Sequence, residues 1–264
     1  MQRTVSVQLG LAIHGSTNMV FSMTPAIGAD IASERLEFRL DGVLQEYREL
    51  VDVHGTRLQN FVTEKGRLTV DYALEIAGEA AVDPIDERDV ITYLRPSRYA
   101  QSDALTPFAR SLFGGLSGYT LVQAITDWVF ESLAYVPGSS RPTDGATDTL
   151  ELRRGVCRDF SHVTIALLRA MEIPARLVAV YAPGLSPMDF HAVTEAFVDG
   201  AWWVIDSSRL APRQSLIRIS TGRDAADTAW LTSTWTDLDV KSMLVTVAAE
   251  SLPLDNHVER VQLR

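Results

Sequence analysis

The stretch of sequence that decides the fold is Gly155-Val156-Cys157-Arg158-Asp159-Phe160-Ser161-His162. Beyond it, apolar residues recur at the three- and four-residue spacing of a helix face that packs on a core. These residues are Phe160, Val163, Thr164, Leu167 and Ala170. We therefore expect a helix that begins at or near Cys157 and ends before Ile173-Pro174.

Cys157 is the only cysteine of the chain, so no internal disulfide can form. The first N–H groups of a helix lack internal partners, and the helix dipole is positive there. Helix N-termini are therefore among the settings that lower the pKa of a cysteine and make its thiolate available as a nucleophile. The plainer alternative is a buried core cysteine, which is common. The position directly after Gly155-Val156 favours the nucleophile.

His191 and Asp206 are the candidate partners of this thiol. Residues 191–198 and 202–206 have the pattern of two strands, and Asp199-Gly200 between them is a typical hairpin turn. Pairing across that turn predicts that Asp206 lies almost opposite His191 or one register step away, where a carboxylate can orient an imidazole. Taken singly, His191 could be a surface histidine and Asp206 a turn residue.

The N-terminal part is predicted to be β-rich. Strict two-residue alternation of apolar side chains indicates strands at residues 5–13, 36–40 and 68–76, separated by turn dipeptides such as Asp41-Gly42. We expect a small antiparallel sandwich over residues 1–95 and a second domain over residues 96–264. Residues 94–102 resemble a linker, and a helical period follows from Leu121 to Ser132.

Composition narrows the possible functions. The chain has 264 residues and a formal net charge of -10, which disfavours binding to nucleic acid. Its apolar runs are too short for a membrane-spanning helix, and its first residues alternate polar and apolar rather than forming a secretory signal. We expect a cytoplasmic protein that does not bind a membrane. The sequence does not predict its oligomeric state.

Four segments resemble the transglutaminase-like superfamily, most strongly between residues 119 and 227. The first is the Gly-Val-Cys stretch already quoted, and the second, residues 168–176, is similar to the family's helix exit. Phe190-His191-Ala192 resembles its histidine strand and residues 202–206 its aspartate strand. Two departures stand out, because relatives often have Trp where this chain has Val193 and usually have Pro-Thr where it has Ser207-Ser208.

The resemblance implies an α+β fold, with a papain-like core of helices packed on an antiparallel sheet after the β-sandwich-like domain. It implies a Cys157, His191, Asp206 triad that hydrolyses an amide or peptide bond through a thioester on Cys157, as a cysteine peptidase or amidase. The expected substrate is a peptide or protein amide, with no cofactor and no metal. The N–H group of Cys157 would donate a hydrogen bond to the oxyanion of the intermediate. Tyr135 is a candidate for the second donor, and Trp128 is expected to pack in the core.

Other functions remain open at this stage. An amine in place of water would make the chain a protein-glutamine transglutaminase. A thioester donor would make it an acyltransferase like the arylamine acetyltransferases, and loss of catalysis would make it a binding scaffold. A zinc site built from the three candidate residues is chemically allowed but poor in histidine.

Several other residues were weighed beside these. His162 is expected to be structural, because it points away from Cys157 on the same helix. Asp189 and Glu195 could bind a substrate amine, although solvated surface positions are expected for both. Trp202-Trp203 could line an acyl groove, with one ring buried and one exposed.

Overall fold

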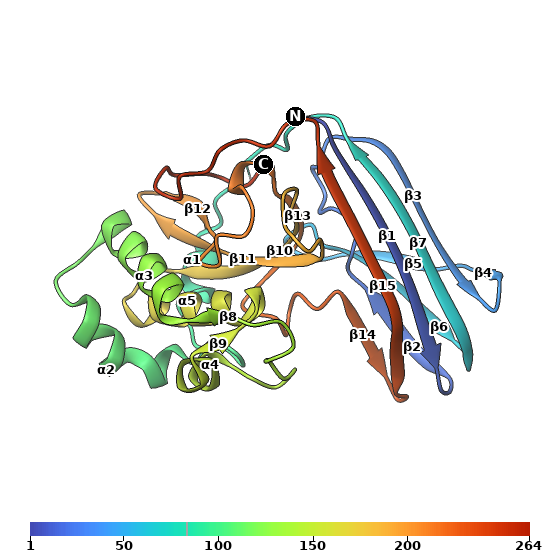
Figure 1. The fold of residues 1–264 in the computed structure, drawn as a ribbon, viewed down its shortest axis with the longest axis horizontal. Helices are drawn as coiled ribbons and strands as arrows, with labels where there is room; N and C mark the ends of the chain where they lie inside the picture. Colours follow the sequence, from blue (N-terminus) through green and yellow to red (C-terminus); the bar gives the residue numbers. More distant parts are fainter. Residues whose placement is uncertain (83) are drawn as a thin grey trace.

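The computed structural model describes residues 1–82 and 84–264, which form a β-sandwich packed beside an α+β core (Figure 1). This arrangement confirms the predicted fold class. None of the helices in these residues is long and apolar enough to span a lipid bilayer.

Two antiparallel sheets make up the sandwich. The larger has the order β15-β1-β7-β3-β4 and the smaller β14-β2-β6-β5. Their strands are β1 (Arg3–Ile13), β2 (Thr17–Phe21), β3 (Ile31–Leu40), β4 (Val43–Gln45), β5 (Arg48–Val51), β6 (Arg57–Thr63), β7 (Gly66–Ile76), β14 (Leu231–Thr234) and β15 (Leu238–Ala249).

Alternating side chains hold the two sheets together. The odd-numbered residues of β1, from Val5 to Ile13, are all buried, as the two-residue period of a strand with one inner face requires. The ring of Phe38 on the larger sheet lies 4.9 Å from that of Phe21 and 4.8 Å from that of Phe61, both on the smaller sheet. These aromatic contacts fill the space between the sheets.

The core contains the helices and a four-stranded sheet of order β12-β11-β10-β13. Its helices are α1 (Glu87–Thr92), α2 (Ser102–Phe113), α3 (Gly118–Ser132), α4 (Ala146–Leu152) and α5 (Cys157–Ala170), with a short 3-10 turn, η1 (Arg213–Ser215). Its strands are β8 (Ala134–Tyr135), β9 (Arg154–Gly155), β10 (Ala175–Tyr181), β11 (Phe190–Val198), β12 (Ala201–Ile205) and β13 (Ile217–Gly222). Apolar residues of α5 pack with Leu177 of β10 and Ala196 of β11 in one cluster, so α5 is the central helix of the core.

The C-terminal part of the chain departs from the predicted division at residue 95. β15 pairs with β1 from Arg3↔Ala249 to Ile13↔Leu238, and β14 pairs with β2, so residues 231–249 complete the sandwich. The remaining segment returns to the core, where the N–H of Val204 donates to the carbonyl of Val261. The expected domain of residues 96–264 therefore needs correction, because the first strands of the sandwich leave edges that only the later strands pair.

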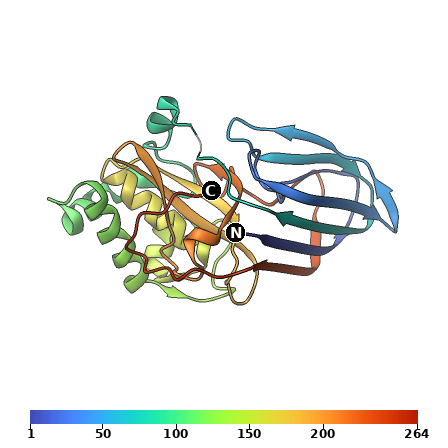
Figure 2. The same ribbon diagram turned by 90° about the horizontal axis from the view of Figure 1, so that it is seen from above.

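The sandwich and the core share a continuous apolar contact. Tyr181 of β10 donates its hydroxyl hydrogen to the carbonyl of Met23 at 2.6 Å, and its ring lies 6.5 Å from that of Tyr72 on β7. Ile217 and Ile219 of β13 belong to the same cluster as the sandwich interior. Figure 2 shows the two bodies side by side, with both chain termini near their junction.

Candidate active site

Cys157 is the first residue of helix α5, as predicted. Val156 before it is extended, and its carbonyl accepts the first helical hydrogen bonds from the N–H groups of Asp159 and Phe160. The side chain of Cys157 is partly exposed rather than sealed in the core. A thiol in this position faces both solvent and the free N–H groups of the helix end.

Gly155 and Asp159 explain why the helix starts at this residue. The Asp159 carboxylate accepts a hydrogen bond from the N–H of Val156 at 2.8 Å, which closes the first turn back on itself. A Cβ at residue 155 would lie 2.6 Å from Cβ of Asp159, closer than atoms can pack. Glycine is therefore required for the carboxylate to reach this place.

Tyr135 is brought to the thiol by a short parallel pairing of β8 with β9, in which Tyr135 lies beside Gly155. Its ring packs 5.8 Å from that of Phe160 on α5. Burial raises the pKa of Tyr135, the charge and side chain of Cys157 raise it further, and a hydrogen bond with the Cys157 backbone opposes the shift. The phenol therefore lies next to both the amide and the sulfur of Cys157.

His191 and Asp206 form a buried pair. The Nε2 atom of His191 lies 3.0 Å from Oδ2 of Asp206, and the two residues are only 2% and 3% exposed. The β11–β12 ladder ends at Thr194↔Ile205, and continuing it places Asp206 opposite Val193, diagonal to His191 on the same face. Asp206 therefore lies near His191 as predicted, but two residues away from direct opposition, one residue further than the predicted register allowed.

The electrostatics of this pair fix the state of the imidazole. Burial disfavours the charged form, but the charge and hydrogen bond of Asp206 and the neighbouring Cys157 outweigh it and raise the pKa of His191 to about 10. Burial also opposes ionisation of Asp206, yet His191 and Ser208 lower the pKa of that carboxyl. Nε2–H of His191 therefore donates to the ionised carboxylate of Asp206. Nδ1 of His191 has no hydrogen bond of normal geometry to the described residues, so it is available to the thiol.

Ser207 and Ser208, the departures noted in the sequence, hold Asp206 in place. Oδ1 of Asp206 accepts hydrogen bonds from the hydroxyl of Ser208 at 2.6 Å and from its N–H at 2.9 Å. The Ser207 hydroxyl lies 2.7 Å from that of Thr164 on α5. These contacts were not predicted, because two serines after a strand are common in ordinary turns.

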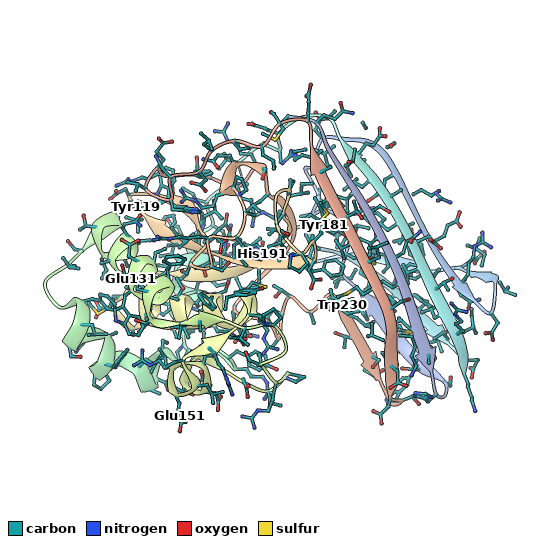
Figure 3. The ribbon with its side chains drawn as sticks, viewed as in Figure 1. Tyr119, Glu131, Glu151, Tyr181, His191 and Trp230 are labelled. Carbon is teal, nitrogen blue, oxygen red and sulfur yellow. The ribbon has the colours of Figure 1, made fainter. Side chains whose placement is uncertain are left out.

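Cys157 and His191 open into a cavity of about 430 Å³ between the core and the sandwich. The sandwich and the segment leading to it supply Ser22, Trp230, Leu231 and Met243, which line the same cavity as Cys157 and His191. The rings of Trp230 and Phe190 stack at 5.6 Å. Figure 3 places His191, Tyr181 and Trp230 together at this junction, whereas Tyr119, Glu131 and Glu151 lie in the part of the core away from it.

The segment from Asp224 to Trp230 is fastened to α5 through His162. Nε2 of His162 accepts a hydrogen bond from the N–H of Ala225, and its ring stacks on Tyr99 at 5.1 Å. Burial lowers the pKa of His162 to about 3, so the ring is neutral. The structural role predicted for His162 therefore agrees with its contacts.

Three other residues weighed from the sequence lie away from the cavity. Trp128 packs against Phe108 and Phe113 in the helical layer, as expected. Of the tryptophan pair, Trp202 is buried and Trp203 partly exposed, but neither lines the cavity of Cys157.

Glu195 is a correction, because it is buried rather than solvated. It is the cross-strand partner of Arg176, whose Nε donates to its carboxylate at 2.8 Å. Arg218 donates to the same carboxylate at 2.7 Å.

Within the described residues, no group of three or more His, Cys, Asp or Glu side chains is arranged to hold a metal ion.

A cysteine at the start of the central helix, with a histidine and an aspartate from adjoining strands, is the arrangement of the papain-like class. Residues 107–207 match the family model of the transglutaminase-like superfamily. A solved structure from Cytophaga hutchinsonii, described as a "putative cysteine protease", is 31% identical with a TM-score of 0.89, over 100% of this chain and 98% of that one. The chain belongs to the transglutaminase-like superfamily.

A second relative is a protein of Mycobacterium leprae (strain TN) that carries the description "uncharacterized protein". It is 29% identical over 185 residues, and the match covers 63% of this chain and 63% of the relative. The chain therefore spans less than two thirds of that relative's length.

Proposed function

We propose that the protein hydrolyses an amide or peptide bond through a thioester on Cys157, as a cysteine peptidase or amidase. The observation that carries the proposal is the position of His191. Its Nε2 is held by a buried carboxylate while its Nδ1 is left for a thiol at the head of a helix, beside an open cavity. Such a chain of nucleophile, base and orienting group is what thiol acyl transfer requires.

The first half of the reaction forms the thioester. The raised pKa of His191 keeps the imidazolium at neutral pH, which favours a thiolate on Cys157 as its counter-ion. The sulfur attacks the carbonyl carbon, and negative charge moves to the carbonyl oxygen. The N–H of Cys157 and the hydroxyl of Tyr135, which lie side by side, can donate to that oxygen. His191 then gives its Nδ1 proton to the leaving nitrogen as the carbon–nitrogen bond breaks.

The second half releases the acid. Neutral His191 accepts a proton from a water molecule, whose oxygen attacks the thioester carbon. The carbon–sulfur bond breaks, the sulfur leaves as thiolate, and the imidazolium is restored. Asp206 stays ionised throughout, because Ser208 donates two hydrogen bonds to its Oδ1. Its Oδ2 keeps the imidazole ring of His191 oriented.

The test uses a library of peptide amides, incubated with the wild-type protein and with Cys157→Ala, with and without an added primary amine. Mass spectrometry separates hydrolysed products from amine-exchanged ones. We expect hydrolysed products from the wild type alone, whereas amine-exchanged products would support the transglutaminase alternative. Cys157→Ser is a matched control, since it keeps the size and polarity of the side chain but has a poorer nucleophile. Identical behaviour of wild type and Cys157→Ala would favour a binding scaffold.

A further inference from the structure

Asp189 is a carboxylate at the mouth of the cavity that the mechanism does not use. It precedes β11 by one residue and lines the same cavity as Cys157 and His191. Its negative charge acts on His191 and on Tyr135, both of which also interact with Cys157. Asp189 therefore lies close to the place where a substrate carbonyl must sit.

No cation of the described residues forms an ion pair with Asp189. Its one hydrogen bond there comes from the N–H of the next residue, Phe190, at 2.7 Å. Solvent reaches the side chain, yet neighbouring protein atoms remove enough water to raise the pKa of its carboxyl. The charge of His191 partly opposes this rise, yet no side chain of the described residues pairs directly with the carboxylate, which therefore gains from a cation brought by a ligand.

The basic side chain in the cavity lining, Arg158, is already engaged. Its guanidinium contacts the Asp159 carboxylate at 3.0 Å and donates to the carbonyl of Arg141 at 2.7 Å. It is therefore occupied with holding the loop at residues 140–141 against the start of α5. Asp189 is left as the charged group of the cavity mouth that can recognise a ligand.

The wall beside Asp189 is apolar and aromatic. We call Phe190, Trp230, Leu231 and Met243 the apolar wall; Phe190 stacks on Trp230, and the N–H of Ser22 on the sandwich side donates to the carbonyl of Trp230. Such a surface accepts an aliphatic stem, and aromatic faces also attract ammonium groups. The carboxylate and the wall together match a primary ammonium on a hydrocarbon chain.

We propose that Asp189 and the apolar wall form a subsite for a primary ammonium group on an aliphatic stem, next to the carbonyl that Cys157 attacks. The ammonium belongs either to the acyl substrate, as a lysine side chain or an amino terminus, or to a free amine that meets the thioester. The role of this subsite in catalysis rests on the proposed function. Its preference for cations can be measured without any turnover of substrate.

The first experiment measures that preference through the thiol itself. Cys157 is treated at pH 8 with a cationic reagent, trimethylammonioethyl methanethiosulfonate, and with neutral methyl methanethiosulfonate. We expect Asp189→Asn to lower the ratio of the cationic rate to the neutral rate by about fivefold or more. Glu151→Gln, an exposed residue on α4 away from the cavity, should leave the ratio unchanged. An unchanged ratio in Asp189→Asn overturns the subsite.

The second experiment identifies the source of the ammonium. Peptide amides that carry lysine or norleucine at each position flanking the scissile amide differ only by the charged group at the end of the stem. A wild-type preference for lysine that Asp189→Asn loses assigns the subsite to the acyl substrate. Exchange of n-pentylamine into norleucine peptides, with a KM for the amine that rises in Asp189→Asn, assigns it to an acceptor.

The two hypotheses fail in different ways. A Cys157-dependent hydrolysis whose selectivity is the same in wild type and Asp189→Asn contradicts the subsite and leaves the proposed function standing. A reagent ratio that depends on Asp189, in a protein with no Cys157-dependent turnover, supports the subsite and contradicts the proposed function.

Discussion

His191 and Asp206 meet as diagonal neighbours on two antiparallel strands, with Nε2 and Oδ2 3.0 Å apart in a buried position. Nε2 of His191 is hydrogen-bonded to the Asp206 carboxylate, whereas Nδ1 of His191 has no hydrogen-bond partner in the described residues.

Asp206→Asn should lower the pKa of His191. The carboxylate raises that pKa to about 10 against the opposing effect of burial, and asparagine removes the charge while burial remains. The imidazolium stabilises the thiolate that reacts with iodoacetamide, so alkylation of Cys157 near neutral pH should be slower in the variant, in which more of the ring is neutral. A pH profile of the iodoacetamide rate measures this, and coincident profiles would contradict the role given to Asp206.

Ser208→Ala should weaken the hold on Asp206. The variant loses the 2.6 Å hydroxyl contact and keeps the backbone one, so we expect kcat/KM to fall by about tenfold, as for a hydrogen bond to a charged group. Ser208→Thr supplies the hydroxyl again and should restore the rate, which a purely steric role for Ser208 would not explain.

Tyr135→Phe should slow the chemistry while leaving binding nearly intact. The ring keeps its packing on Phe160, and only the hydroxyl beside Cys157 is lost. If the hydroxyl donates to the oxyanion, kcat falls by about 10²-fold at nearly constant KM. Steady-state kinetics separate the two constants, and a change confined to KM would place Tyr135 in substrate binding instead.

Glu195→Gln should destabilise the fold rather than alter the chemistry. The buried carboxylate bridges Arg176 and Arg218, which lower its pKa to about 2 against the effect of burial. We expect a loss of about 3 kcal/mol in the free energy of unfolding at pH 7, measured with urea. Because the folded pKa is depressed, this contribution is present above the usual value of 4.5 and is lost as pH falls toward 2. Glu151→Gln should show no such loss.

The parts of the fold that could be predicted from sequence are those governed by local pattern. Alternation predicts the strand at residues 5–13, which the structure extends to Arg3–Ile13, and the Asp199-Gly200 turn predicts the approximate register that brings Asp206 to His191. Gly155 and Cys157 marked the start of the central helix. The catalytic roles of Cys157, His191 and Asp206 stay a prediction, as does a cytoplasmic location.

The parts that could not be predicted depend on contacts between distant segments. Nothing local in residues 231–249 distinguishes a strand of the sandwich from a strand of the core, because pairing partners more than two hundred residues away decide it. The sequence predicts a surface position for Glu195, because alternation alone does not reveal that two arginines converge on its carboxylate. Its cross-strand partner, Arg176, was visible in the sequence, but the pairing of β10 with β11 was not.

The return of β14 and β15 to the sandwich also sets an order of events during synthesis. Translation proceeds from the N-terminus, so Cys157, His191 and Asp206 leave the ribosome before Leu231 and Met243 do. A nascent chain therefore holds its thiol, imidazole and carboxylate while one side of the cavity is still missing. The cavity can be completed only after β15 has been made and has paired with β1, so the full lining of the cavity forms late in the synthesis of each molecule.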